Sequence, residues 1–405
     1  MVVILTRTSN FESIITTIDE PIAFILGKYA TTGLGVCRCF GRQVVPVFWL
    51  DSNSKQVGFL SKYCTGVVCP HPKYNETDYV DFLVAIGEKL LHKGVLFPIG
   101  DTEVIAILKH RIKLERYYHI PMADLKVTEI LLNKQKFYQT LETQGILHPR
   151  TFFPDDVSEL ESISKEVRYP CIVKPVHSES FRLEFNTKFF KVESRQELIQ
   201  EYRKVTSKKQ EVVIQEIIPG DAKHMCGFNA YYNKNFTPNG VFMYRRIREW
   251  PPVSGNGALI ENVGLPELEE IITPLVKKIK YYGIVDAEFK KDPRSGMFNL
   301  IEINPRCWMQ VGLPLICGAN LPYIAYLDAL GKDVKNITPK KEHAKWMFMF
   351  QDTPSSLKSM INDDLSLRKW ISSYKGKKAY AIFAWDDPAP FFLGFVRILS
   401  SIFRY

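Results

Sequence analysis

Three oxygen-bearing side chains on two neighbouring apolar segments are the strongest chemical signal in the sequence. Glu288 lies within residues 286–289, and Glu302 and Asn304 lie within residues 301–306. Alternate residues of a strand face one side, so Glu302 and Asn304 share a face. A turn rich in Asp, Pro, Ser and Gly predicts that the two segments pair as a hairpin. Mg2+ prefers such oxygen ligands, shared with nucleotide phosphates. The alternative is a half-exposed strand whose polar side chains face water.

Two lysines and one strand end upstream of the hairpin complete a nucleotide-binding hypothesis. Lys174 ends the apolar strand predicted at 170–176, and Lys134 lies in the segment 126–144, which is predicted to be a single helix. An ammonium group at such a position can point at phosphate oxygens, whereas the alternative is a solvated lysine. Residues 213–220 form a strand that runs into a linker, and the exposed backbone there could pair with an adenine edge.

The first part of the chain predicts a parallel sheet with helices on both faces. Apolar strands at 21–27, 44–50 and 95–99 alternate with helical segments, which is typical of a doubly wound α/β sheet. Ligands bind beyond the carboxyl ends of the strands in such sheets. The turn predicted at 28–33 and Asp101 occupy these positions, so Asp101 is a candidate substrate-binding residue by position.

Composition and charge limit the classes of protein that need be considered. The 405 residues are 46% hydrophobic and 24% charged, as in globular proteins of two to three domains. None of the eight cysteines forms a CxxC pair, which favours free thiols in a reducing compartment. The net charge of +9 favours anionic partners but is too small to indicate nucleic-acid binding. No segment approaches the roughly 20 apolar residues of a membrane span, so we expect a cytoplasmic protein.

Taken in chain order, these segments resemble the ATP-grasp superfamily of ATP-dependent ligases. The resemblance covers about residues 20–335 and rests on the ordered segments NKQKF, TQGILHPRT, YPCIVKP, VIQEIIPGD, DAEF and IEINPR. It implies an α/β fold, α+β in its C-terminal half, in which ATP lies between two antiparallel sheets. The implied units are a Rossmann-like pre-ATP-grasp domain at 1–125, a lid at 126–217, a metal-binding C-terminal subdomain at 218–335 and an extension at 336–405.

The resemblance also implies a role for individual residues. The phosphates of ATP would contact Lys134 and Lys174. Adenine would contact the end of the strand and the linker, at Gln215, Glu216, Ile217 and Ile218. Either Asp221 or Lys223 would contact the ribose. Glu288, Glu302 and Asn304 match the metal ligands, and Arg306 matches an arginine near the phosphates and the reacting carboxylate. The lid loop departs from the family because it has no glycine, so Ser178 and Ser180 are expected to replace its backbone donors.

The implied reaction is carboxylate–amine ligation. A carboxylate attacks the γ-phosphate of ATP to give an acylphosphate, and an amine then displaces phosphate to give an amide. The expected cofactor is Mg2+, with Mn2+ as an alternative, and Arg248 is expected to bind a substrate carboxylate in a bidentate fork. The loop and the region around Arg248 are similar to a subgroup that includes the D-aspartate ligases. The expected substrates are therefore a small-molecule amino acid and a carboxylate, and the acceptor could be an anionic, lipid-linked or cell-envelope precursor.

Two other functions and two readings of the C-terminus stay open. The chain could be an ATP-binding module without ligase activity, because the lid lacks glycine, or a carboxylating ATP-grasp enzyme. Residues 388–405 place apolar side chains at helical spacing, with Arg397 and Arg404 as the only charges. This pattern predicts either a helix docked on the core or on the partner in a homodimer, which is favoured, or an interfacial helix on the inner face of an anionic membrane.

Overall fold

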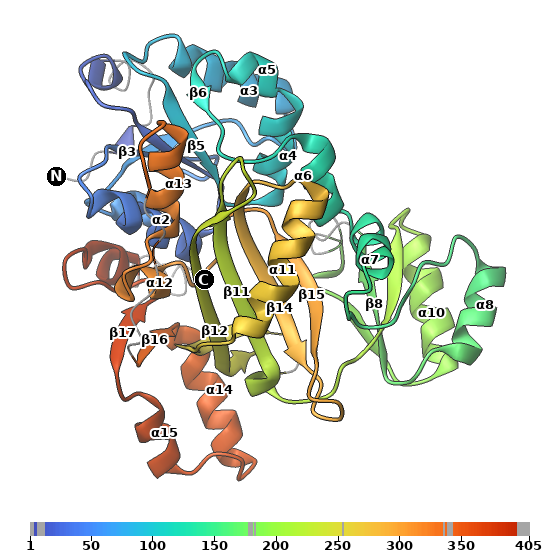
Figure 1. The fold of residues 1–405 in the computed structure, drawn as a ribbon. Helices are drawn as coiled ribbons and strands as arrows, with labels where there is room; N and C mark the ends of the chain where they lie inside the picture. Colours follow the sequence, from blue (N-terminus) through green and yellow to red (C-terminus); the bar gives the residue numbers. More distant parts are fainter. Residues whose placement is uncertain are drawn as a thin grey trace, which may run out of the picture.

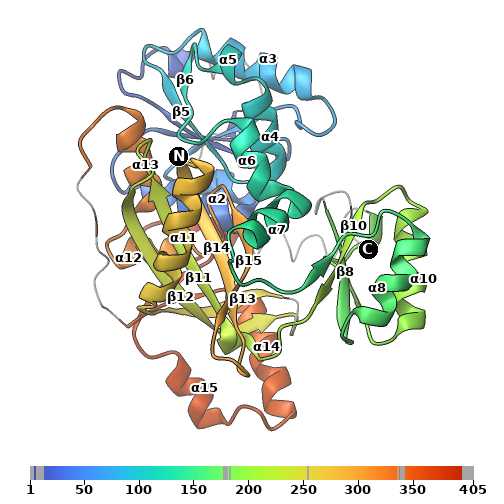
Figure 2. The ribbon, with the colours of Figure 1, turned by 45° about the vertical axis from the view of Figure 1, so that its right-hand side comes forward.

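The computed structural model of the chain describes residues 4–5, 13–176, 181, 184–252, 255–334, 337 and 343–394. An N-terminal α/β unit lies above a large, mostly antiparallel sheet, and a small lid of strands and helices projects to one side (Figures 1 and 2). The predicted mixed α/β fold is confirmed.

The N-terminal unit is a parallel sheet with the strand order β1-β4-β3-β2-β5-β6. Its elements are β1 (Ile4–Leu5), β2 (Ala23–Leu26), α2 (Ala30–Gly41), β3 (Val47–Asp51), η1 (Val57–Leu60), β4 (Thr65–Val68), α3 (Glu76–Gly87), β5 (Gly94–Pro98), α4 (Asp101–Lys109), α5 (Arg111–Leu114) and β6 (Tyr118–His119). The strand order reverses between β2 and β5, so their carboxyl ends form the crevice where such sheets bind ligands. Helix α2 starts at this crevice. The prediction of a turn over residues 28–33 was wrong, because the helix already begins at Ala30.

The segment predicted as one helix at 126–144 is two helices, α6 (Leu125–Leu132) and α7 (Lys134–Thr143). Asn133 separates them: its backbone is extended, and its side-chain oxygen accepts a hydrogen bond from the Lys136 N–H at 3.0 Å. Asparagine is a favourable N-cap because this bond satisfies one of the unpaired amides of the first turn. The break places Lys134 at the start of α7.

The lid is a four-stranded antiparallel sheet of order β7-β10-β8-β9, with two helices on one face (Figure 2). Its elements are β7 (Thr151–Phe152), α8 (Val157–Glu166), β8 (Cys171–Pro175), β9 (Phe190–Val192), α10 (Arg195–Thr206) and β10 (Val212–Glu216). The helices bury one face of the sheet in a core of the lid's own, with Leu160, Val173 and Leu198 fully buried. The opposite face is thereby left to form the wall of a cavity.

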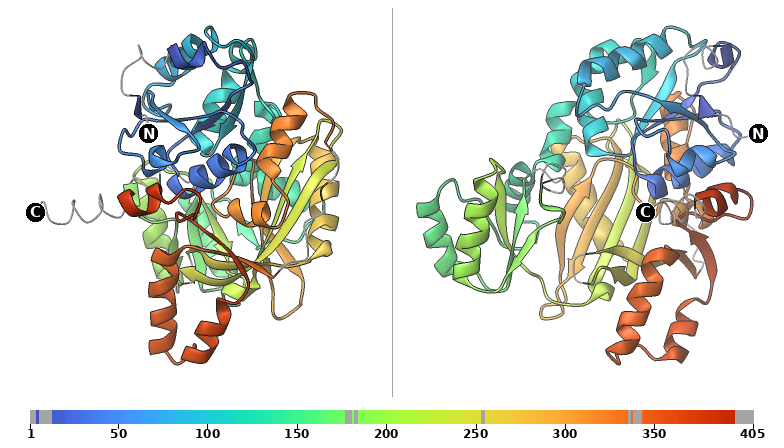
Figure 3. Two further views of the ribbon diagram at one scale, coloured as in Figure 1. Left: turned by 90° about the vertical axis from the view of Figure 1, so that its left-hand side faces the viewer. Right: turned by 180° about the vertical axis from the view of Figure 1, so that it is seen from behind.

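The large sheet has seven strands in the order β15-β14-β11-β12-β13-β16-β17. The elements from this point on are η2 (Ala222–His224), β11 (Met225–Tyr232), β12 (Pro238–Trp250), β13 (Asn256–Asn262), α11 (Pro266–Ile279), β14 (Gly283–Lys291), β15 (Phe298–Asn304), α12 (Gly312–Ile316), α13 (Leu321–Ala329), β16 (Ala344–Met347), α14 (Met349–Ile361), α15 (Leu367–Ser373) and β17 (Lys377–Tyr380). The C-terminal extension therefore adds two strands to this sheet, and its helices α14 and α15 project away from the N-terminal unit (Figure 3).

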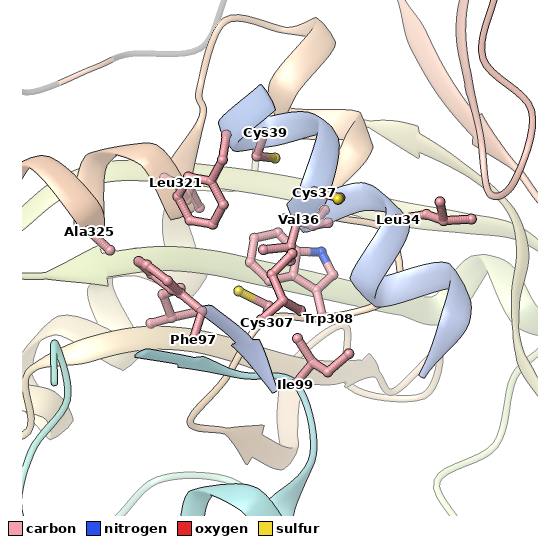
Figure 4. Close-up of a cluster of buried hydrophobic side chains, with 14 of the residues drawn as sticks. Leu34, Val36, Cys37, Cys39, Phe97, Ile99, Cys307, Trp308, Leu321 and Ala325 are labelled. Atoms are coloured by element: carbon pink, nitrogen blue, oxygen red, sulfur yellow. The ribbon is translucent and has the colours of Figure 1, made fainter. Parts of the chain in front are cut away.

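A shared hydrophobic core fixes the N-terminal unit against the large sheet. Val36 of α2 and Phe97 of β5 lie beside Cys307 and Trp308, which follow β15 (Figure 4). All four side chains are at most 2% exposed. Because Cys307 is immobilised in this core, the preceding residue, Arg306, is held at the boundary between the two units.

The described start of the C-terminal segment rests on the protein. Residues 389–394 are helical, and the Phe391 ring lies 6.3 Å from that of Phe350 and 5.5 Å from that of Phe383. Phe392 and Leu393 face solvent. The rest of the segment predicted as an interfacial helix lies outside the described residues. No helix in the described part of the chain is long and apolar enough to cross a membrane.

Candidate functional site

A cavity of about 380 Å³ opens between the lid, the large sheet and the first turn of α2. This volume falls in the range of small-molecule sites. The predicted site residues that line it are Lys134, Lys174, Gln215, Glu216, Ile217, Ile218, Glu288, Glu302, Asn304 and Arg306. Residues that are as much as 172 positions apart in the sequence therefore meet in one place.

The three predicted metal ligands lie on paired strands at the floor of the cavity. Glu288 of β14 is directly opposite Glu302 of β15, and Asn304 is opposite Asp286. The Asn304 amide nitrogen donates to Asp286 Oδ2 at 3.1 Å, so the amide oxygen is directed towards the cavity. There the Asn304 oxygen accepts a hydrogen bond from Arg306 at 3.3 Å. Two carboxylates directly opposite each other repel unless a cation lies between or beside them.

The donors fit a hard cation that also binds phosphate oxygens. Two carboxylates and one amide oxygen match the chemistry of Mg2+, which takes few protein ligands and completes its shell with phosphates and water. In the described part of the chain no three His, Cys, Asp or Glu side chains converge as a self-sufficient metal site.

The buried Lys174 and the half-buried Lys134 line the same cavity as Glu302. Lys174 is 8% exposed, and its ammonium donates to the Tyr138 hydroxyl and to Gln215 Oε1, each at 2.8 Å. Burial lowers the pKa of Lys174 to about 8, although Glu302 opposes the shift. Burial and the neighbouring Lys174 lower the pKa of Lys134. Burial would raise the pKa of Glu302, but Lys134 and Lys174 outweigh it and hold that pKa below its ordinary value. The site is thus an ion cluster with spare positive charge.

The end of β10 has the features of an adenine pocket. Ile172, Ile217 and Ile218 line the cavity and supply apolar surface. The pairing of β10 with β8 stops at Glu216, so the backbone beyond it is free of the sheet. Gln215 is held by the Thr151 hydroxyl, to which its amide donates at 2.7 Å, and Glu216 accepts from the Arg168 N–H at 3.1 Å. The side chains are thereby fixed, and the backbone beyond them is available to a ligand edge.

Arg306, which follows β15, forms an ion pair with the N-terminal unit. Its Nε donates to Asp101 Oδ1 at 2.6 Å, and Asp101 begins α4. Burial would lower the pKa of Arg306, but Asp101 outweighs it and raises that pKa. Asp101 is not part of the cavity lining, so the structure places this predicted substrate residue behind Arg306 rather than against a ligand.

The carboxylate fork predicted for Arg248 is already occupied, which corrects that expectation. Its Nε and Nη2 donate to the two oxygens of Asp352, at 2.7 and 2.9 Å, and it does not line the cavity. Arg246 lines the cavity instead and donates to Glu288 Oε2 at 2.8 Å. Simple alternation would put both arginines on one face, but the pairing of β12 with β13 shifts register between Arg246 and Arg248. This bulge separates their directions.

The remaining predicted residues lie elsewhere or outside the described chain. Asp221 and Lys223 are exposed and do not line the cavity; Asp221 instead caps η2 by accepting from the Lys223 N–H at 3.0 Å. Ser178 and Ser180 lie outside the described residues. One cavity residue that the sequence did not indicate is Lys188 of the lid, which donates to Asn256 Oδ1 of the large sheet at 2.7 Å. It connects the two walls of the cavity.

Comparison with known proteins supports the same fold. No family model matches the chain. It is 29% identical over 226 residues to a D-aspartate ligase from Enterococcus faecium, a match that covers 53% of each chain. The chain thus matches about half the length of that relative.

Solved structures match a larger share of the chain. An N5-carboxyaminoimidazole synthetase from Staphylococcus aureus has a TM-score of 0.63 at 15% identity and covers 85% of this chain and 86% of its own. An L-amino acid ligase from Bacillus licheniformis has a TM-score of 0.62 at 16% identity, with coverages of 80% and 78%. The biotin carboxylase domain of a Hydrogenobacter thermophilus 2-oxoglutarate carboxylase, solved with MgADP and bicarbonate, has a TM-score of 0.60 at 16% identity, with coverages of 78% and 71%. The chain therefore shares the fold of these solved structures, and about half of its sequence is similar to that of a D-aspartate ligase.

Proposed function

We propose that the protein is an ATP-dependent carboxylate–amine ligase that forms an amide through an acylphosphate. The observation that carries this proposal is that Glu302 lines one cavity with the buried Lys174 and the half-buried Lys134, together with Asn304 and Arg306. This is the charge pattern needed to bind Mg-ATP and to neutralise a phosphoryl group in transfer. The relationship to a D-aspartate ligase supports the choice of an amino acid as one substrate.

The residues of the chain would contribute by position and charge. Ile172, Ile217 and Ile218 would hold adenine, and Lys134 and Lys174 would bind phosphate oxygens. Glu288, Glu302 and Asn304 would hold Mg2+, which supplies charge neutralisation on the phosphates. Arg306, oriented by Asp101, would bind the carboxylate as it attacks the γ-phosphate. Such catalysis needs no covalent enzyme intermediate because positioning and electrostatic stabilisation lower the barrier.

The decisive experiment measures ADP release with Mg-ATP across L- and D-amino acids, each with hydroxylamine as the nucleophile. Hydroxylamine converts an acylphosphate to a hydroxamate, so the assay needs no knowledge of the natural amine. The proposal predicts that one amino acid gives equal amounts of ADP and hydroxamate. Lys174→Ala is the matched loss-of-function control, and Lys204→Ala, an exposed lid lysine, is the neutral one. ATP binding without hydroxamate from any amino acid would contradict the proposal and favour a binding module.

A carboxylating enzyme is the second candidate. One structural neighbour is a carboxylase domain solved with bicarbonate, and another is named as an N5-carboxyaminoimidazole synthetase. The same assay separates the two. ADP release that requires bicarbonate and is indifferent to amino acids would identify a carboxylating enzyme, whereas ADP release that requires an amino acid would identify the ligase.

We propose further that the ligase works at an anionic membrane surface. Phe392 and Leu393, in the helix at 389–394, are exposed at 59% and 47%. Such apolar side chains in a segment whose only charges are Arg397 and Arg404 favour an anionic interface. Flotation with phosphatidylglycerol vesicles should carry the full chain but not a chain that ends at Asp387. Equal flotation of the two would contradict this location.

A further inference from the structure

A second cavity, of about 350 Å³, lies on the other side of the first turn of α2 from the candidate ATP site. Thr31 lines both cavities. Met309 and Gln310 line the first and Gly312 lines the second, so one short segment and the start of α2 together form the wall between them. The second cavity is therefore adjacent to the end of the ATP site that holds Arg306.

The wall lies at the reacting end of the ATP site. Arg306 donates to Asn304, the predicted metal ligand, and Tyr29, which immediately precedes α2, raises the pKa of Arg306. Adenine would occupy the opposite end, beside the isoleucines of the lid. A nucleophile that reaches the acyl group without crossing the nucleotide must therefore come from the side of α2.

The lining of the second cavity favours an uncharged, apolar or aromatic group. Trp346, Phe383 and Trp385 contribute aromatic surface, and Leu315 and Ile316 contribute aliphatic surface. Its charged side chains already have partners. Arg42 donates to both oxygens of Asp386 at 2.8 Å, and Lys378 donates to the Gly376 carbonyl at 3.1 Å. Arg38 donates to the Asp387 carboxylate at 3.0 Å and to the carbonyls of Ile382 and Asp387. The N–H groups of both arginines are therefore taken up within the protein, and we place the substrate carboxylate in the first cavity.

We propose that this second cavity is the subsite for the amine acceptor and binds the apolar or aromatic body of an extended amine. The inference rests on the proposed ligase function. The amine passes Thr31, its lone pair attacks the acyl carbon, and a C–N bond forms. The C–O bond to phosphate breaks, phosphate leaves with that electron pair, and the amine loses one proton. The C-terminal extension, which supplies Phe383 and Trp385, thereby selects the acceptor.

The test compares two nucleophiles of different size with one amino acid and Mg-ATP. Hydroxylamine is too small to use the second cavity. The extended probes are 1,5-diaminopentanes acylated on one nitrogen by acetyl or by 2-naphthoyl. We expect kcat/KM for the naphthoyl amine to exceed that for the acetyl amine about tenfold or more, because an apolar pocket discriminates by such factors. The ratio of amide to hydroxamate formation is the readout.

Gly312 offers a matched pair of variants. A Cβ at this position would lie 3.8 Å from the Ala379 Cβ and 3.9 Å from Trp346 Cδ1, which are ordinary contacts. Gly312→Ala should therefore keep the ratio, whereas Gly312→Leu should fill the cavity and lower the ratio for the naphthoyl amine about tenfold. Trp385→Ala, at a side chain 87% exposed, should lower it without loss of folding, and Tyr74→Ala, at a side chain 74% exposed elsewhere, should not.

The outcomes separate this inference from the function beneath it. No wild-type hydroxamate would remove the ligase function and the subsite together. Hydroxamate with equal rates for the two acylated amines would overturn the subsite alone. A naphthoyl preference that survives both Gly312→Leu and Trp385→Ala would likewise place the acceptor elsewhere.

Discussion

Arg306 Nε lies 2.6 Å from Asp101 Oδ1. This ion pair links the segment after β15 of the large sheet to the first turn of α4 in the N-terminal unit. Arg306 lies two residues after Asn304, and the next residue, Cys307, is buried in the shared core. We infer that Asp101 is a positioning residue, because it contacts Arg306 and does not line the cavity.

Replacing Asp101 with Asn should lower kcat about tenfold, equivalent to about 1.4 kcal/mol of transition-state stabilisation, with little change in the KM for ATP. The amide cannot match the charge that fixes the guanidinium, and ATP contacts are retained. Steady-state ADP release measures both constants. Asp81→Asn removes an exposed partner of Lys113 and is the control. A wild-type kcat in Asp101→Asn, or a rise in the KM for ATP alone, would contradict this role.

Glu302→Gln should fold but lose Mg-ATP turnover by about 100-fold or more, because a carboxylate that binds the metal is replaced by a weaker neutral ligand. Circular dichroism checks folding, and ADP release over a range of Mg2+ concentrations measures the loss. Glu261→Gln, which removes the exposed partner of Arg245 on β13, provides the matched control. Unchanged turnover in Glu302→Gln would remove the metal assignment.

The sequence predicted the residues that lie on short, regular elements. Glu302 and Asn304 could be placed on one face because the pairing of β15 with β14 is regular from Glu302 to Asn304, and Lys174 could be placed at a strand end because an apolar run precedes it. Both predictions depend only on local geometry. That these residues meet in one cavity could be expected only from the family resemblance, which implies how the strands are arranged in space.

Arg248 shows where sequence reasoning stopped. The pairing of β12 with β13 shifts register twice between Arg246 and Glu249, and nothing in the residues 245–250 signals these irregularities. The partner that occupies Arg248, Asp352, is 104 residues away in the extension. Asn133 is a contrasting case, because asparagine before a helical run is a recognised N-cap and could have predicted the break between α6 and α7.

The lowered pKa of Lys174 predicts a loss of ATP binding at alkaline pH. With a pKa of about 8, Lys174 is charged below pH 8 and loses its proton above it. Phosphate binding needs the charged form, so kcat/KM for ATP should fall about tenfold per pH unit above pH 8. Lys174→Arg keeps its charge throughout this range and should remove the decline. A decline of the same midpoint in Lys174→Arg would assign it to another group.

The Arg248–Asp352 pair should contribute to stability and not to turnover. Arg248 is 7% exposed and Asp352 is fully buried, so Asp352→Asn leaves an uncompensated guanidinium and should lower the free energy of unfolding by about 3–5 kcal/mol. Removing both charges in Arg248→Met/Asp352→Leu should recover most of that loss, because a buried ion pair and an apolar pair of similar volume differ little in stability. Urea unfolding measures both changes, and Arg245→Met, at the exposed pair with Glu261, should cost no more than about 1 kcal/mol. ADP release then decides between the two roles of Arg248. If the guanidinium of Arg248 bound the substrate carboxylate, the double variant would be stable but inactive. Because Asp352 already occupies that guanidinium, we expect the double variant to release ADP at the rate of the wild type.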